Sequence, residues 1–297
     1  MVNGIVYVLR AWNPYPQLGS GPINGFPKED GDLTHWRRQE ASSWLVCFVF
    51  RKRRRARIEL YLPLSYGIPR VDDRRVISGI VFLIRNGLRW RDASSDYGLP
   101  KSIYNRFIRW RQLGVFNKVF AELAGKGPRP ERLMIDATHL NAHRTAASLP
   151  KKRGCSPTYR AHQRRAELKV HAVCDGEGRP PVMLLSEGQM SDDTAAALMI
   201  DHLPKAKVPL GDKGYDVEGF REALAKRNIT PCITSKANRK IQIDYDKVLY
   251  KQCRKVEDIF GQFKDWRRIH TRYDRFAHTF MSAIAIAATV IFWLGPQ

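Results

Sequence analysis

Residues 125–132 (GKGPRPER) separate two stretches of the chain whose hydrophobic patterns differ. Before this segment apolar residues recur at helical spacing, whereas after it short apolar strands alternate with helices. Glycine, proline and charged residues give the segment the composition of a linker. The sequence therefore predicts an all-α unit over residues 56–125 and an α/β unit over residues 130–297, with a mixed sheet flanked by helices.

The first unit contains three predicted helices, over residues 72–86, 102–113 and 116–123. Asp72 or Asp73 can cap the first helix. A tight turn and a basic second helix are typical of helix-turn-helix-like DNA-binding domains. An ordinary helical bundle with solvated arginines is the alternative. The candidate DNA contacts around the second helix are Lys101, Arg106, Arg109 and Arg111.

The charge of the chain favours a polyanionic partner. Lysine and arginine number 51 against 29 acidic residues, a formal net charge of +22, which points to nucleic acid. Five scattered cysteines argue against a disulfide scaffold and fit a reducing, cytoplasmic setting. The apolar stretch from Phe280 to Leu294 is shorter than the ~20 residues that span a bilayer, so we expect a buried helix and no membrane partner.

Residues 1–55 differ in composition from the rest. Prolines and glycines are frequent between residues 11 and 31, and no hydrophobic period persists there, so we expect an irregular, disordered extension. The basic run RKRRRAR (51–57) ends this part of the chain, as a solvated tail or as a DNA backbone contact.

In the second unit, alternating patterns predict a hairpin in which residues 168–174 pair with 181–185. A long basic loop precedes it at 144–166. The remaining predicted strands cover 133–135, 208–210 and 230–234, and the remaining predicted helices cover 195–203, 217–227, 248–268 and the apolar segment 280–294.

Three acidic residues stand where a metal site is expected. Asp136 and Asp212 each follow the end of an apolar predicted strand, and sites in open sheets gather at such ends. Glu257 lies on a helix beside apolar Val256 and Ile259, at the edge of a buried face. Converging carboxylates would hold two Mg²⁺ ions, about 4 Å apart, which activate a water or a 3′-hydroxyl at a phosphodiester. Taken singly, each aspartate is equally a turn or cap residue.

From about residue 57 to 297 the chain closely resembles the DDE transposases of bacterial insertion sequences, in the insertion-sequence-five family. The resemblance is carried by the segments GIPRVDDRRVISGIVFLIRNGLRWRDA, LPKSIYNRFIRW, MIDATHLNAHR, LKVHAVCDGEGRP, LLSEGQMSDD, GDKGYD and VEDIFGQFKDWRRIHTRYDR. It implies a ribonuclease-H-like catalytic core behind a helix-turn-helix-like domain. It also implies that Asp136, Asp212 and Glu257 are the catalytic, metal-binding acids. Residues 1–55 do not match the family, and one hypothesis is that they derive from an upstream misassigned start or a frame fusion.

The family motif around the third acid is matched by Tyr250 and Lys264, which the resemblance makes catalytic candidates. Cys253 replaces the arginine of the motif, with Arg254 adjacent. Lys264 lies two helical turns beyond Glu257 and would reach a DNA phosphate. The basic–aromatic segment 266–275 adds Arg267 and Arg268, with Arg254, to the expected DNA contacts.

The expected function is a transposase that binds the terminal inverted repeats of its element, cleaves the ends and joins them to target DNA. Mg²⁺ is the expected cofactor, with Mn²⁺ as a substitute, and the partners are double-stranded DNA and a second copy of the chain in a paired-end complex. The protein would be cytoplasmic and associated with the nucleoid when bound to DNA. One alternative is a degenerate copy that binds DNA without cutting it, which the intact triad disfavours but Cys253 and the unusual N-terminus keep open. Another is a metal-dependent nuclease without strand transfer.

Overall fold

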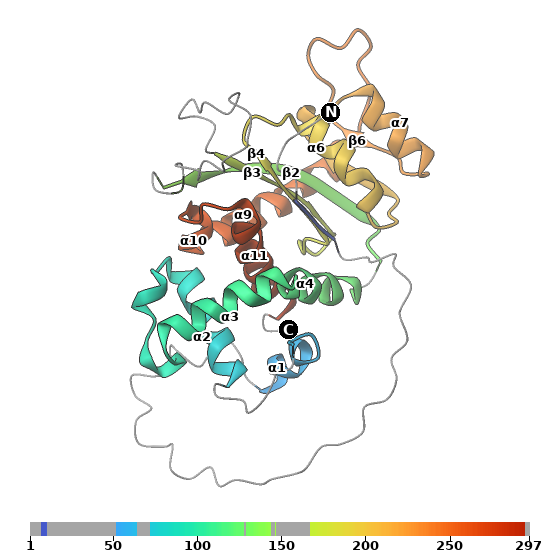
Figure 1. Cartoon of the computed structure of the whole chain (residues 1–297). Helices are drawn as coiled ribbons and strands as arrows, with labels where there is room; N and C mark the ends of the chain where they lie inside the picture. Colours follow the sequence, from blue (N-terminus) through green and yellow to red (C-terminus); the bar gives the residue numbers. More distant parts are fainter. Residues whose placement is uncertain are drawn as a thin grey trace.

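The computed structural model describes residues 7–10, 52–63, 72–127, 129–143, 146 and 167–294, with side chains from residue 56 onward. It has a mixed α/β architecture built on one seven-stranded sheet (Figure 1). The strands are β1 (Tyr7–Arg10), β2 (Arg132–Ala142), β3 (Leu168–Cys174), β4 (Val182–Glu187), β5 (Val208–Gly211), β6 (Cys232–Ile233) and β7 (Thr271–Arg272).

The order of strands in the sheet is β1-β4-β3-β2-β5-β6, with β7 added on β2. Strands β2, β3 and β4 pair antiparallel, whereas β5 and β6 run parallel to β2. The predicted hairpin is confirmed as β3 and β4. The sequence thus gives a mixed sheet, as its patterns predicted.

Two predictions about strands are wrong. Residues 7–10, expected to be irregular, form β1, which pairs antiparallel with β4; most of the remaining extension lies outside the described residues. Strand β2 does not end at Asp136 but continues to Ala142, because residues after Asp136 stay paired with β3 as far as Leu140, whose side chain is buried. Apart from Ala146, the expected loop at 144–166 also falls outside the described part of the chain.

Helices cover both faces of the sheet (Figure 1). One face packs against α6 (Asp192–Met199) and α7 (Glu218–Lys226), forming a cluster around Leu184 and Leu224. The other face packs against α9 (Arg254–Lys264) and α11 (Ala277–Ala288). Alternate side chains of the strands therefore enter two different cores.

The three helices predicted for the N-terminal unit are present as α2 (Asp73–Asn86), α3 (Pro100–Gln112) and α4 (Val115–Gly125), and α1 (Lys52–Glu59) precedes them. Their apolar side chains share one core cluster with α9, α11 and a face of the sheet. These helices are thus packed onto the α/β unit. Their role as a helix-turn-helix-like DNA reader stays a prediction.

Helix α2 illustrates how local sequence sets the ends of a helix. The Asp72 carboxylate accepts a hydrogen bond from the Arg74 backbone N–H at 2.8 Å, which caps the first turn. Gly87 adopts a left-handed conformation (φ +66°) and ends the helix, as glycine does at little steric cost. The predicted bounds of this helix are confirmed.

The single long helix predicted over 248–268 is instead broken into α8 (Lys247–Tyr250), a 3₁₀ turn η8 (Lys251–Cys253), α9 and α10 (Arg267–His270). The break before α10 occurs at Trp266, whose backbone is extended (φ −86°, ψ 102°) and whose side chain is buried. We interpret the break as a consequence of burying the Trp266 indole, which stabilises the fold more than continuing the helix through this residue would.

The apolar C-terminal helix predicted from the sequence is α11, continued by a π-helical turn η9 (Thr289–Trp293). Ala283, Ile284 and Ala285 are fully buried, so protein surrounds the helix on all sides. Among the described residues, no helix has both the length and the apolar character needed to cross a membrane.

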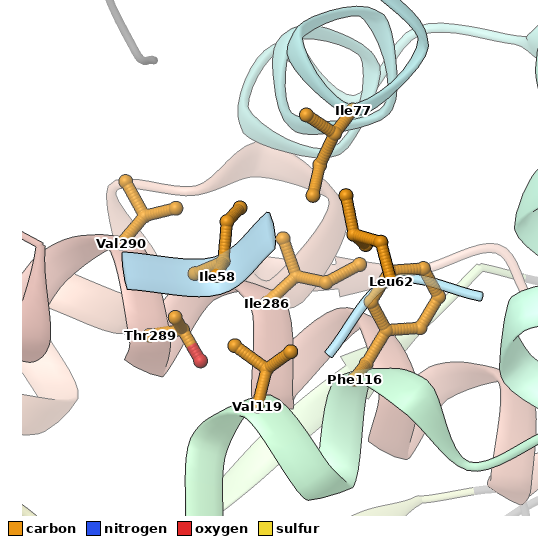
Figure 2. A pocket seen from close by; sticks show the side chains of 8 residues that line it. All are labelled: Ile58, Leu62, Ile77, Phe116, Val119, Ile286, Thr289 and Val290. Atoms are coloured by element: carbon orange, nitrogen blue, oxygen red, sulfur yellow. The ribbon is translucent and has the colours of Figure 1, made fainter. Parts of the chain in front are cut away.

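A small apolar cavity lies where residues around α1 meet α2, α4 and the end of α11 (Figure 2). Its volume is about 20 Å³, and Ile58, Ile77 and Phe116 are among its lining residues. The hydroxyl of Thr289 donates to the carbonyl of Ala285 at 2.7 Å and offers the cavity little polarity. An apolar space of this size stays dry, so we interpret it as a packing gap.

Arg268 joins α10 to the N-terminal helices. The guanidinium forms two hydrogen bonds with the Asp274 carboxylate, at 2.8 and 3.1 Å, and donates to the Leu88 carbonyl at 3.1 Å. It also lies 5.1 Å from the centroid of the Trp90 ring. With Arg268 only 5% exposed, this group is an internal ion pair.

We expect Arg268→Ala to lower the free energy of unfolding by about 3–5 kcal/mol, because it leaves the buried Asp274 carboxylate unpaired. Arg267→Ala, at the exposed neighbouring position, is the control and should cost less than about 1 kcal/mol. Urea unfolding followed by circular dichroism measures both. Wild-type stability of Arg268→Ala together with weakened DNA binding would instead make Arg268 a DNA contact.

Candidate active site

The first two acids are brought together by strand register. Strand β5 pairs parallel with β2, with Ile135 opposite Gly211. Asp136 and Asp212 follow these partners, so they lie side by side at neighbouring positions of the sheet. Asp136 is half-buried inside β2 and Asp212 is half-buried just after β5. The expectation that Asp212 follows a strand end is confirmed.

Asp136 faces the helix that carries Glu257. Side chains alternate along β2, and both Met134 and Leu140 belong to the cluster that contains α9 residues, which places Asp136 on that face. Helix α9 packs on β2 and β3, with Val256 and Phe260 buried. Glu257 lies exposed in the first turn of α9, at the edge of this contact.

The environment raises the pKa of Asp136 to about 6. Burial is the largest cause, and the negative charges of Asp212, Asp192 and Glu257 add to it, although the Ala137 N–H donates to Asp136 Oδ1 at 2.7 Å and opposes the shift. The three sequence-predicted acids therefore share one electrostatic neighbourhood. Across the described ranges, however, no three His, Cys, Asp or Glu side chains already stand close enough to hold a metal ion.

Asp212 is oriented by its own turn. It precedes the 3₁₀ turn η7 (Lys213–Tyr215), and its Oδ1 accepts a hydrogen bond from the Gly214 N–H at 2.9 Å. Tyr215 ends this turn in the core, where burial and the charges of Asp192, Asp136 and Asp212 raise its pKa. One carboxylate oxygen of Asp212 is thus fixed by the backbone.

Cys253, at the position of the motif arginine, lies within this acidic neighbourhood. Burial, a nearby Cys232 and the charges of Asp136, Asp212 and Glu257 raise the pKa of its thiol to about 12. The thiol is therefore neutral at physiological pH and supplies no positive charge. Arg254, the next residue, is exposed at the start of α9.

The two other motif residues differ in placement. Tyr250 is half-buried at the end of α8, and its ring meets that of Tyr245 edge-on with centroids 5.4 Å apart. Burial raises the pKa of Tyr250, and the Asp212 charge contributes. Lys264 is exposed as the last residue of α9, on the helix that carries Glu257.

Three of the predicted DNA contacts have partners inside the protein. Arg106 forms an ion pair with Asp73 at 2.8 Å, Arg111 donates to the Thr279 hydroxyl at 3.0 Å, and Arg268 is buried against Asp274. These contacts engage the three guanidinium groups within the protein, and their contact with DNA stays a prediction. Lys101, Arg109, Arg254 and Arg267 are exposed, and their contact with DNA stays a prediction.

Sequence reasoning missed Asp192, whose charge raises the pKa of Asp136. It begins α6, directly after the segment that follows β4. The signal was present in the sequence, since a pair of acids at a helix start beyond a strand end resembles the placement used to select Asp136 and Asp212.

Two family models match the chain. A transposase DDE domain covers residues 127–292, more than half of the chain, and a model for transposases of the IS4/5 family covers residues 54–120. The chain therefore belongs to the DDE transposases of the IS4/5 type, as the resemblance predicted. Such a domain implies in general an enzyme of DNA cleavage and transfer that uses divalent metal ions and has DNA as its partner.

Several curated proteins are similar to the chain. A protein assigned as the transposase of insertion sequence element IS402 from Burkholderia cepacia is 27% identical over 63% of this chain and 90% of its own length. A protein assigned to element IS6501 from Brucella ovis is 28% identical over 42% of this chain and 97% of its own length. Protein y4sN of Sinorhizobium fredii is 34% identical over 29% of this chain and 68% of its own length.

The raised pKa of Asp136 predicts how stability changes with pH. Between pH about 4 and 6 the folded metal-free protein binds more protons than the unfolded chain, so this carboxyl reduces stability as the pH rises through that window. Asp136→Asn should therefore be more stable than wild type at pH 7, by on the order of 2 kcal/mol, with the difference vanishing below pH about 4.

Urea unfolding of metal-free protein across this pH range measures the difference. Asp201→Asn, at an exposed position, is the control, and its free energy of unfolding should equal that of wild type at each pH. If the free energies of unfolding of Asp136→Asn and wild type differ by the same amount from pH 4 to 7, the raised pKa of Asp136 is contradicted.

Proposed function

We propose that the chain binds the terminal inverted repeats of its insertion sequence, cleaves the DNA ends and joins the freed 3′-hydroxyls to target DNA. The register that sets Asp136 beside Asp212 under the helix bearing Glu257 is the observation that carries this proposal. The strand order β4-β3-β2-β5-β6, antiparallel and then parallel, supports a ribonuclease-H-like core.

The donor set suits a hard divalent cation. Asp136, Asp212 and Glu257 offer oxygen ligands, and burial, together with the charges of the neighbouring carboxylates, raises the pKa of Asp136. Mg²⁺, with Mn²⁺ as a substitute, would lie among these three carboxylates. When bound, the cation activates the attacking oxygen and stabilises the leaving oxygen at the phosphodiester.

The remaining residues of the chain bind and orient the substrate. Lys264 and Arg254 present exposed cations at the two ends of α9 and would hold DNA phosphates near Glu257. Tyr250 would pack beside the reacting strand. Lys101 and Arg109 on α3, with Arg267 on α10, extend the basic surface. Two copies of the chain would act together on paired ends.

If the three acids bind the metal ion, substituting any one of them should abolish cleavage but leave DNA binding nearly unchanged. Asp136→Asn, Asp212→Asn and Glu257→Gln each remove a charged ligand while keeping side-chain shape, and each should reduce cleavage of end DNA by at least about 100-fold. Affinity for the same DNA without metal should stay within about threefold of wild type. A Mg²⁺-dependent cleavage assay and a fluorescence binding assay measure the two quantities.

Glu222→Gln, on the exposed side of α7, is the matched control and should cleave like wild type. Robust cutting by any of the three triad variants would remove that residue from the site. Cutting without joined product would favour the metal-dependent nuclease.

The placement of Cys253 supports a second candidate, a chain that binds DNA and cuts it poorly. A neutral thiol cannot fork onto a carboxylate or phosphate as arginine does. We expect Cys253→Arg to raise the cleavage rate about tenfold, the equivalent of one charge-assisted hydrogen bond, with little change in DNA affinity.

Arg254→Ala is measured on the same DNA as the comparison variant. Equal rates for wild type and Cys253→Arg, with collapse for Arg254→Ala, would mean that Arg254 already supplies the charge and that the thiol is an inert packing residue.

A further inference from the structure

Asp192 and Asp212 lie on either side of Gly214. A Cβ atom built on Gly214 would stand 2.9 Å from Asp212 Oδ1 and 3.1 Å from Asp192 Oδ2. Both oxygens therefore lie within about 3 Å of one point that no side chain can occupy. The absence of a side chain at residue 214 leaves room for both carboxylate oxygens beside its backbone.

Lys169 holds the Asp192 carboxylate in this position. Its ammonium group lies 2.6 Å from Asp192 Oδ1, and the two side chains are only 11% and 28% exposed. Lys169 is in β3, paired with His139 of β2, so the cation is attached to the strand next to the one that bears Asp136. The ion pair thereby ties the start of α6 to the centre of the sheet.

A buried histidine faces the same carboxylate. His171 is completely buried in β3, and its Nδ1 lies 3.7 Å from Asp192 Oδ1 without a hydrogen-bond partner among the described groups. Its Nε2 is hydrogen-bonded to the Ser186 hydroxyl at 2.9 Å, which fixes the ring. Asp192 is thus bounded by Lys169 and His171, both from β3, and by Gly214 in the turn after β5.

We propose that Lys169 and Asp192 form a positioning pair for Asp212. Asp192, fixed by Lys169, packs against Gly214; Gly214 donates its N–H to Asp212 Oδ1 at 2.9 Å; and the second Asp212 oxygen is left to bind a cation. The proposal rests on the proposed function, since it assumes that Asp212 is a metal ligand. Groups that orient a metal ligand contribute to the protein's affinity for the metal ion, as the ligand itself does.

A purely structural role for Asp192 has a matched control. Asp192 and Asp193 both lie in the first turn of α6, where an acidic side chain favours the helix through its dipole. Asp193→Asn removes that benefit without touching the contact with Lys169. If Asp192→Asn weakens metal binding and Asp193→Asn does not, the loss is therefore due to the Lys169–Asp192 ion pair and not to destabilisation of α6.

The experiment is a titration of the full-length, DNA-free protein with Mn²⁺, read as free Mn²⁺ by electron paramagnetic resonance. Asp192→Asn and Lys169→Met should each weaken Mn²⁺ binding about tenfold, and the double variant should be no weaker than either, because both remove one interaction. Lys169→Arg keeps the ion pair and should stay within about threefold of wild type. Asp193→Asn should match wild type.

Wild-type Mn²⁺ affinity in Asp192→Asn and Lys169→Met, with loss in Asp212→Asn, would overturn the positioning role and leave the proposed function standing. Wild-type affinity in Asp136→Asn and Asp212→Asn as well would instead remove the proposed metal centre. If Asp192→Asn does not fold, equal affinities of Lys169→Met and Lys169→Arg overturn the pair.

Discussion

Burial of α11 on every side organises the molecule. Its alanines between residues 283 and 288 are fully buried, and their short side chains let α4, α2 and α9 approach its backbone closely. The same cluster continues onto one face of the sheet, so the N-terminal helices, the C-terminal helices and the strands share one apolar interior. The position of α9 on β2, and with it the position of Glu257, follows from this packing.

Gathering several carboxylates around Asp136 costs electrostatic free energy, and nearby hydrogen-bond donors and a cation offset part of it. Burial of Asp136 on an interior strand of the sheet and repulsion from the neighbouring carboxylates both raise its pKa. Backbone donors at Ala137 and Gly214 and the ammonium group of Lys169 offset part of that cost. Under the proposed function, a divalent cation bound by these carboxylates would relieve the remaining repulsion between them.

Local patterns were enough to predict the helix ended by Gly87, the β3–β4 hairpin and the strand before Asp212, because their signals lie within a few residues. Patterns also predicted the mixed sheet, whereas the family resemblance supplied the ribonuclease-H-like assignment and the three candidate acids. Ion pairs were not predictable: Arg106 meets a partner 33 residues away and Arg111 one 168 residues away, so only the folded chain reveals them. A basic side chain in such a helix can form an ion pair or hydrogen bond within the protein, or it can contact DNA. The sequence alone does not distinguish these two outcomes.

Strand β1 gives residues 7–10 a role in covering the β4 edge of the sheet. Residues 7–10 pair along β4 from Val182 to Leu185, and without them β4 would present a row of unpaired backbone donors and acceptors. Exposed edges of this kind recruit strands from other molecules. A shortened chain that begins after residue 55 would therefore be prone to edge-to-edge aggregation even with its acidic site intact, and its insolubility would say nothing about its chemistry.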